Sequence, residues 1–368
     1  MLPFKMMSIR FLLHLSLPWS VPALVLALIQ AFIPAPAFGQ GPSIPDHGVV
    51  LMYHHFGENR YPATNVRLDA FDAQLNHLAE NDYQIWPLAR LVKHIQTGTP
   101  IPDRVVSITV DDAYLSVYTQ AYPRLKARGW PFTVFVATDG VDRRFKALMT
   151  WQQMREMAKG GVTFANHGTS HGHLTKRQPD ETETDWQQRI QADIQNAQER
   201  LQKELGEAPM LFAYPYGEYD LALIKIVNEL GYTAFGQHSG AVGRHADPAA
   251  LPRFPVSEHH ATGTNFHTKV ASLPLPVTGP DPVAVSLKQT GNPPTLTFTV
   301  PPDEAKISRL NCFASDQGEV PVTWRDRAAQ RVSVTAPAPL IGPRSRYNCT
   351  APSPFSGRFY WYSHPWFR

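Results

Sequence analysis

The sequence predicts an α/β fold, a parallel sheet or barrel, followed by a small all-β region. From Val49 to Phe254, short apolar runs alternate with helical patterns, as in parallel sheets whose strands are joined by helices. After residue 272 the sequence pattern changes. Proline-rich turns separate short runs of alternating apolar and polar residues, and no helical pattern of useful length remains. This second pattern is typical of a β-sandwich.

Short apolar runs predict the strands of the first region. These runs are residues 49–53, 83–85, 105–110, 132–137, 162–165, 211–214 and 232–235. Apolar residues at helical spacing predict helices between them, at 71–78, 117–125, 186–205 and 223–230. Glycines suited to ending a helix follow three of these patterns, at Gly129, Gly206 and Gly231.

Proline is unusually frequent in the chain. It makes up 34 of 368 residues, about 9% against a usual ~5%. Much of it lies after residue 272, where it favours rigid turns and edge strands over a helix bundle. The alternating runs 283–287, 296–300, 320–324 and 332–335 predict the strands of this second region.

The N-terminus is typical of an export signal. Lys5 and Arg10 form a basic start, an apolar run follows at 21–33, and Ala37 and Gly39 are spaced as a cleavage site. An uncleaved membrane anchor is the alternative, although a clean run of about 13 residues is short for a span.

We therefore expect three segments: a signal peptide over 1–39, an α/β domain over 40–272 and a β-sandwich domain over 273–368. The formal charge of +3 falls to +1 once Lys5 and Arg10 are removed with the signal. A near-neutral mature protein gives no electrostatic case for binding nucleic acid.

The only two cysteines, Cys312 and Cys349, both lie in the second region. In an exported protein they could pair as a disulfide that closes one domain. Spacing alone does not show that they are close in space, so two buried thiols remain the alternative.

A pair of acidic residues, Asp111 and Asp112, directly follows the predicted strand 105–110. In a parallel α/β fold the carboxyl ends of the strands open onto the active-site face. Two adjacent carboxylates repel one another there unless a cation is near. A helix N-cap is an equally good reading of the pair by itself.

A second motif contains His167 and His171, after the predicted strand 162–165. A helical turn would place residues four apart on one side. One carboxylate and two imidazoles form a common ligand set for a catalytic divalent metal, with positions left for water and substrate. A histidine pair alone usually has a structural role. Because an acidic pair follows another predicted strand, we favour a metal site here.

A third motif, Pro215-Tyr216-Gly217, follows the predicted strand 211–214. Proline and glycine fix a tight turn that can direct the Tyr216 N–H into a pocket. An ordinary strand-exit turn is the alternative.

Taken together, the motifs at 109–114, 167–171 and 214–217 resemble the polysaccharide deacetylases, the NodB-homology domain of carbohydrate esterase family four. The segments 51–55 and 251–254 also resemble that family, particularly its exported members that act on bacterial surface polysaccharides. The resemblance covers about residues 48–260 and implies a deformed (β/α) barrel.

The resemblance also implies roles for individual residues. Asp112, His167 and His171 would hold a divalent metal, most often zinc in this family. Asp111 would be the general base that deprotonates the metal-bound water. The Tyr216 N–H would help to stabilise the oxyanion formed at an N-acetyl carbonyl. Both His54 and His55 sit at the end of the first predicted strand, where one of them could line the pocket, and we expect His55, with Pro215 and Tyr216, to contact the substrate.

Two positions depart from the family pattern near the acidic pair. Ala113 replaces a usual glycine, and Ala213 stands where the third motif often has an arginine that orients the base. Arg253 could supply that cation instead, although an arginine on a surface strand is nearly as good a reading.

The family's general acid, normally a histidine in a late motif, has no match in this chain. His259, His260 and His267 lie in the right part of the sequence. Ordinary loop histidines are the safer interpretation for each of them, so the acid stays unassigned.

We therefore expect an exported enzyme, periplasmic or associated peripherally with the cell envelope, that releases acetate from an N-acetylglucosamine-containing polysaccharide. A non-catalytic polysaccharide-binding protein and a metal-dependent O-acetyl esterase are the alternatives. The aromatic tail at 359–367 favours a last strand packed on the sandwich, with sugar stacking as the rival interpretation.

Overall fold

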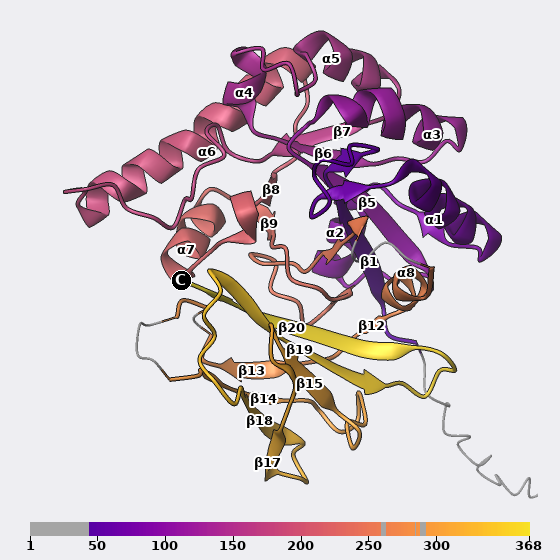
Figure 1. The fold of residues 1–368 in the computed structure, drawn as a ribbon, viewed down its shortest axis with the longest axis vertical. Helices are drawn as coiled ribbons and strands as arrows, with labels where there is room; N and C mark the ends of the chain where they lie inside the picture. Colours follow the sequence, from indigo (N-terminus) through magenta and orange to yellow (C-terminus); the bar gives the residue numbers. More distant parts are fainter. Residues whose placement is uncertain (1–43, 259–262, 284, 288–291) are drawn as a thin grey trace, which may run out of the picture. The chain divides into compact units, whose positions relative to one another are not determined.

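The computed structural model describes residues 44–258, 263–283, 285–287 and 292–368 (Figure 1). The predicted export signal at 1–39 lies outside the described residues. In the part of the chain that is described, no helix is both long and apolar enough to cross a bilayer.

The first region is built around one mainly parallel sheet. Its strands follow the order β10 (Val242–Gly243), β1 (His47–Tyr53), β5 (Val105–Asp111), β6 (Thr133–Val136), β7 (Thr163–Asn166), β8 (Leu211–Ala213) and β9 (Thr233–Phe235). Only β10 runs antiparallel along this path. Every strand predicted for this region is present, and β4 (Gln84–Ile85) pairs with β5.

Helices connect these strands. They are α1 (Leu68–Glu80), α2 (Leu88–Thr97), α3 (Tyr122–Ala127), α4 (Thr138–Asp142), α5 (Trp151–Lys159), α6 (Glu183–Leu205), α7 (Leu221–Glu229) and α8 (Gly263–Val270). The predicted helices correspond to α1, α6, α7 and to α3 with the π-helical turn Val117–Ala121 before it. The sequence did not predict α2, α4, α5 and α8.

A short segment near residue 253 fills the gap between the two ends of the parallel sheet. Leu251 forms a parallel bridge with Phe235 at the end of β9. Two residues later, β11 (Phe254–Pro255) pairs in parallel with β1. The segment therefore joins the last strand to the first, and the deformed barrel predicted from the sequence is confirmed.

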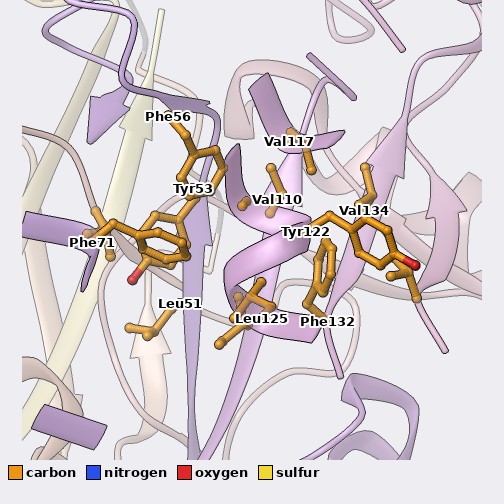
Figure 2. Close-up of a cluster of buried hydrophobic side chains, with 14 of the residues drawn as sticks. Leu51, Tyr53, Phe56, Phe71, Val110, Val117, Tyr122, Leu125, Phe132 and Val134 are labelled. Atoms are coloured by element: carbon orange, nitrogen blue, oxygen red, sulfur yellow. The ribbon is translucent and has the colours of Figure 1, made fainter. Parts of the chain in front are cut away.

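Apolar side chains from several elements pack into one core beside the sheet (Figure 2). Leu51, Val110 and Val134, on three adjacent strands, are fully buried there together with Phe71 of α1 and Leu125 of α3. Burying one such side chain contributes about 1.5–3 kcal/mol. This packing fixes the strand ends from which the polar motifs emerge.

The C-terminal β region, residues 273–368, contains two sheets. One has the order β12 (Leu273–Pro274), β20 (Phe359–Phe367), β19 (Arg344–Pro352), β15 (Asn311–Ala314) and β16 (Gly318–Val320). The other has the order β13 (Thr278–Asp281), β14 (Thr295–Thr299), β18 (Arg331–Thr335) and β17 (Val322–Asp326). The expected all-β architecture is confirmed, while the boundary between 272 and 273 stays a prediction.

Two strand predictions in this region need correction. The run 320–324 is interrupted at Pro321, so that β16 and β17 belong to different sheets. Proline lacks the N–H that a continuous ladder would need. The described residues of the run 283–287 form no strand, only a single bridge between Ser286 and Phe367.

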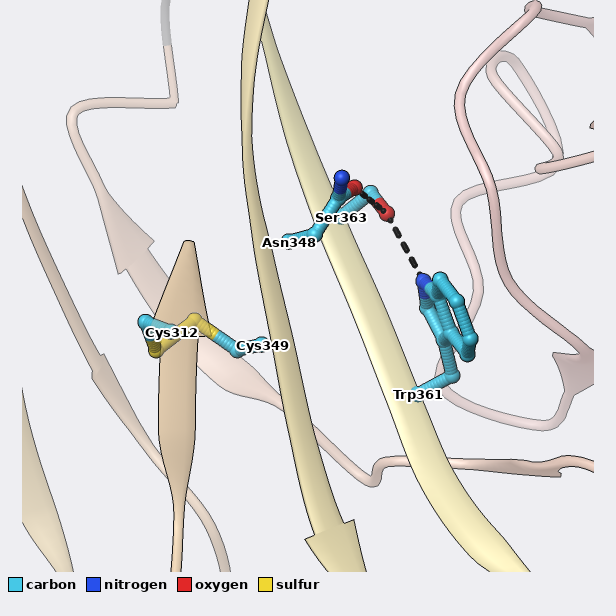
Figure 3. Close-up of a disulfide and its surroundings, with 5 residues drawn as sticks. All are labelled: Cys312, Asn348, Cys349, Trp361 and Ser363. Atoms are coloured by element: carbon cyan, nitrogen blue, oxygen red, sulfur yellow. Dashed lines mark hydrogen bonds between the residues drawn. A yellow bond between two sulfur atoms is a disulfide. The ribbon is translucent and has the colours of Figure 1, made fainter. Parts of the chain in front are cut away.

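Cys312 and Cys349 form a disulfide between β15 and β19, where they lie directly opposite one another (Figure 3). The expected pairing is therefore confirmed.

The aromatic tail is strand β20. Its Tyr360 and Trp366 are buried in the core of the β region, which confirms the packing interpretation. Trp361 donates from Nε1 to Ser363 Oγ at 3.2 Å, and Ser363 donates to Asn348 Oδ1 at 2.6 Å (Figure 3).

Candidate active site

The two adjacent carboxylates at the end of β5 point to different partners. Asp111 is the last residue of the strand and is fully buried. Asp112 has a φ of 73°, so the chain turns sharply out of the strand at this point. The turn directs the two side chains apart. Asp111 pairs with an arginine and Asp112 with two imidazoles, so the repulsion between the adjacent carboxylates is offset.

Asp111 forms a bidentate ion pair with Arg253. The Nη1–Oδ1 and Nη2–Oδ2 distances are 2.7 and 2.8 Å, and both side chains are completely buried. Arg253 also donates to Gly236 O and to Thr109 Oγ1, so its planar guanidinium is fixed. It lies on the segment that closes the barrel, which explains how a residue so distant in sequence reaches β5.

This ion pair keeps Asp111 ionised. Burial alone would raise the pKa of Asp111, but the Arg253 guanidinium and the imidazoles of His167 and His54 hold that pKa below its ordinary value. Asp111 is therefore a carboxylate at neutral pH, able to accept a proton.

Asp112, His167 and His171 converge as the sequence predicts. Asp112 Oδ1 lies 3.0 Å from His171 Nε2 and 3.4 Å from His167 Nε2, and one ligand atom from each residue lies within 4.8 Å of the others. His167 Nδ1 is 2.7 Å from Ala213 O, which assigns the proton to Nδ1 and leaves a lone pair on Nε2.

The buried Nε2 of His167 makes no hydrogen bond within the described structure. A buried polar atom without a partner calls for an explanation, and a bound cation supplies one. The donor set of one carboxylate and two imidazoles suits a divalent metal such as zinc. The three residues therefore fit a metal.

The two histidines do not lie on a helical turn, contrary to the expectation from their spacing. Residues 167–173 form an irregular loop in which Gly168 has a φ of 76° and His171 a φ of 52°. Asp193, on α6, accepts hydrogen bonds from Thr169 N and Ser170 N. A Cβ on Gly168 would lie 2.5 Å from Asp193 Oδ1, so glycine is required there.

The third motif forms a strained turn beside the cluster of one carboxylate and two histidines. Tyr216 adopts the left-handed conformation, with a φ of 59°, between Pro215 and Gly217. Its ring lies 4.6 Å from that of His171, edge to face, and stacks on His173 at 4.2 Å. The motif predicted from the sequence thus adjoins the carboxylate and histidine cluster.

The end of β1 contributes a histidine that the sequence did not assign. His54 Nε2 lies 3.9 Å from Asp111 Oδ2, and burial holds the pKa of His54 below its ordinary value. His55, the residue expected to contact substrate, stacks between Tyr61 and Tyr114 at ring distances of 4.5 and 3.7 Å. The sequence shows that both histidines follow a strand, but it does not show which of the two faces Asp111.

Of the histidines considered for the general acid, His259 and His260 lie outside the described residues. His267 belongs to α8 and stacks on His77 of α1 at 3.6 Å. His267 therefore lies in a helix and not in a loop as expected, and its contact is with another helix.

The comparisons with known proteins agree with this geometry. Residues 98–235 match the family model described as polysaccharide deacetylase. A poly-beta-1,6-N-acetyl-D-glucosamine N-deacetylase of Escherichia coli K12 is 28% identical over 253 residues, which is 58% of this chain and 37% of the relative. The chain thus spans little more than a third of that relative's length.

Two solved structures have the same fold over the first region. A deacetylase from Streptococcus pyogenes in complex with acetate is 25% identical, with a TM-score of 0.52 over 60% of this chain and 95% of its own. The structure of IcaB from Ammonifex degensii is also 25% identical, with a TM-score of 0.52 over 59% of this chain and 95% of its own.

Proposed function

Because the chain belongs to the polysaccharide deacetylase family, we propose that it hydrolyses N-acetyl groups of a polysaccharide that contains N-acetylglucosamine. The observation that carries the proposal is that the two adjacent carboxylates have different partners. Asp112 shares a cluster with two imidazoles, while Asp111 is held beside them by Arg253. In this proposal Asp111 is the base and Asp112 a metal-binding group, and both belong to one site.

Asp112, His167 and His171 would hold the metal, with zinc as the proposed ion. When bound, it would act as a Lewis acid toward the acetyl carbonyl and lower the pKa of a bound water. The chain's own residues then have to bind the acetyl group, orient it and move protons.

The proton transfers can be assigned to two side chains. Asp111 takes a proton from the attacking water, because Arg253 keeps it ionised. His54, whose Nε2 lies 3.9 Å from Asp111 Oδ2 and whose lowered pKa leaves it neutral, accepts that proton from Asp111 and passes it on to the leaving nitrogen. The Tyr216 N–H donates to the carbonyl oxygen as it becomes negative. The products are acetate and a free amine on the sugar.

The rival functions use the same site differently. A polysaccharide-binding protein without activity would not need a fully buried Arg253–Asp111 pair beside an imidazole cluster. An O-acetyl esterase would use the same groups, but a relative of this chain is described as an N-deacetylase, which favours hydrolysis of an N-acetyl group.

We also propose that the protein is exported and works in the periplasm or at the cell envelope. The Cys312–Cys349 disulfide supports an oxidising compartment, because such bonds are rare in reducing ones.

The activity itself is tested on the purified full chain. With zinc present, it should release acetate from a β-linked N-acetylglucosamine oligomer. Treatment with a chelator should abolish the release, and added zinc should restore it. Acetate from an O-acetylated sugar but not from the N-acetylated oligomer would support the esterase, and metal binding without any acetate would support the binding protein.

His54→Gln should lower kcat for the N-acetylated oligomer about 10²-fold, because protonation of the leaving nitrogen is lost. The zinc content should stay at the wild-type level. His77→Gln is the matched control, since that histidine contacts His267 on the surface. Equal kcat values for His54→Gln and the wild type would remove His54 from the reaction.

A further inference from the structure

We propose that Arg344, in the C-terminal β region, is a positioning residue of the active site, which holds the Tyr216 turn in the conformation that deacetylation needs. This inference rests on the proposed function, in which the Tyr216 N–H stabilises the oxyanion. It gives the C-terminal β region a part in catalysis.

The Tyr216 turn needs support from its surroundings. The residue has a φ of 59° and a ψ of 3°, which places an aromatic residue in the left-handed region. Such a conformation costs about 1–3 kcal/mol and persists only where several contacts fix it. The contacts around the residue therefore decide whether its N–H keeps one direction.

The first region fixes the side chain of Tyr216. The ring stacks on His173 with an interplanar angle of 15°, and His173 Nδ1 lies 2.6 Å from Glu218 Oε2. These contacts hold the ring on one side of the turn. They do not bind the Tyr216 carbonyl, whose direction depends on ψ.

Arg344 binds that carbonyl from the C-terminal β region. Its Nη1 donates to Tyr216 O at 3.3 Å, and its guanidinium carbon lies 5.7 Å from the centre of the Tyr216 ring. The two residues are 128 positions apart in sequence. A donor on the carbonyl restricts the ψ of Tyr216, and the stacked ring restricts its side-chain torsions, so the two contacts together hold the residue in its left-handed conformation.

Arg344 is itself anchored at this place. It is the first residue of β19 and lies opposite Phe367 of β20. The Phe367 ring packs edge-on against Tyr219 at 5.3 Å. Arg344 thus contacts Tyr216, and its strand neighbour Phe367 contacts Tyr219 three residues later. The second contact helps to hold Arg344 in place beside Tyr216.

The test compares Arg344→Met with the wild type in the zinc-loaded full chain. The kcat for acetate release should fall about tenfold while KM changes less than twofold, a smaller loss than the 10²–10³ that follows removal of an oxyanion donor. Arg344→Lys, which keeps a donor, should recover part of kcat. Arg331→Met is the control, an exposed arginine on β18 of the same region.

A second measurement does not depend on activity. Hydrogen exchange should become faster in the segment 214–219 of Arg344→Met, whose amides include Gly217 N bonded to Tyr214 O at 2.8 Å. Wild-type kcat in Arg344→Met would overturn the inference, whatever the exchange shows. If the wild type releases no acetate, the proposed function fails, and unchanged exchange would then also rule out Arg344 as the support of the turn.

Discussion

Replacing Asp111 by asparagine should lower kcat for acetate release at least about 10³-fold while the protein still binds zinc. Asparagine keeps the shape of the side chain and one acceptor for Arg253, but it cannot take a proton from water. General base catalysis contributes about 10²–10⁴-fold, and the upper part of that range is expected where the base is fully buried and fixed. The measurement is steady-state acetate release together with the zinc content of the purified variant.

The matched control for this variant is Asp103→Asn. Asp103 also accepts from an arginine, with Arg358 Nη1 at 2.8 Å, but its pair lies at the N-terminal end of β5, opposite the active-site end. Loss of an aspartate–arginine pair alone should leave kcat close to the wild-type value. If Asp111→Asn kept more than a tenth of the wild-type kcat, Asp111 would not be the general base.

Arg253→Met should lower the free energy of unfolding by about 3–5 kcal/mol. Methionine fills much of the space of the arginine but leaves Asp111 as a buried charge without its partner, which is the costly way to break a buried ion pair. Acetate release should also fall, because the pKa of Asp111 is no longer held down by a cation. Urea unfolding followed by circular dichroism measures the first effect.

The double variant Asp111→Asn with Arg253→Met separates the ion pair from packing. With both charges removed, most of the lost stability should return, since two neutral groups of similar size replace the pair. A double variant as unstable as the sum of the two single variants would show that Arg253 acts through its packing on Phe135 and its bond to Gly236 O instead.

The sequence was a good guide to the parts of the site that lie at strand ends. Asp112 and His167 follow predicted strands, and the carboxyl ends of neighbouring parallel strands meet at one edge of the sheet. Their convergence therefore followed from the strand pattern. The shape of the loop after His167 did not, because it depends on Asp193 from a later helix and on backbone angles that residue spacing does not encode.

Contacts between residues far apart in the sequence could not be predicted, for a physical reason. Arg253 and Asp111 are 142 positions apart, and only the closed barrel brings them together. An arginine between Pro252 and Phe254 is equally consistent with a surface strand, so the sequence left both interpretations open. The same holds for the choice of His54 over His55, which depends on the direction of each side chain at the strand end.

Strand β19 shows why part of the C-terminal β region was not predicted. Its buried positions are Ser345, Tyr347, Cys349 and Ala351. Small and polar residues occupy much of its core face, so the alternation of apolar and polar residues that marks a half-buried strand is weak. Helix α2 is a different case, because Leu88, Leu91 and Val92 stand at helical spacing and the pattern was present in the sequence but was not used.

The barrel-closing segment has a consequence for the order in which the parts of the candidate site come together as the chain emerges. A growing chain carries Asp111, both histidines and the Tyr216 turn long before Arg253 has been added. Until that residue docks, Asp111 has no cation to keep it charged inside the protein, and the gap between β9 and β1 stays open. The candidate site is thus completed by one of the last parts of the barrel to emerge, and an incomplete chain would hold the acidic pair and both histidines without the buried ion pair.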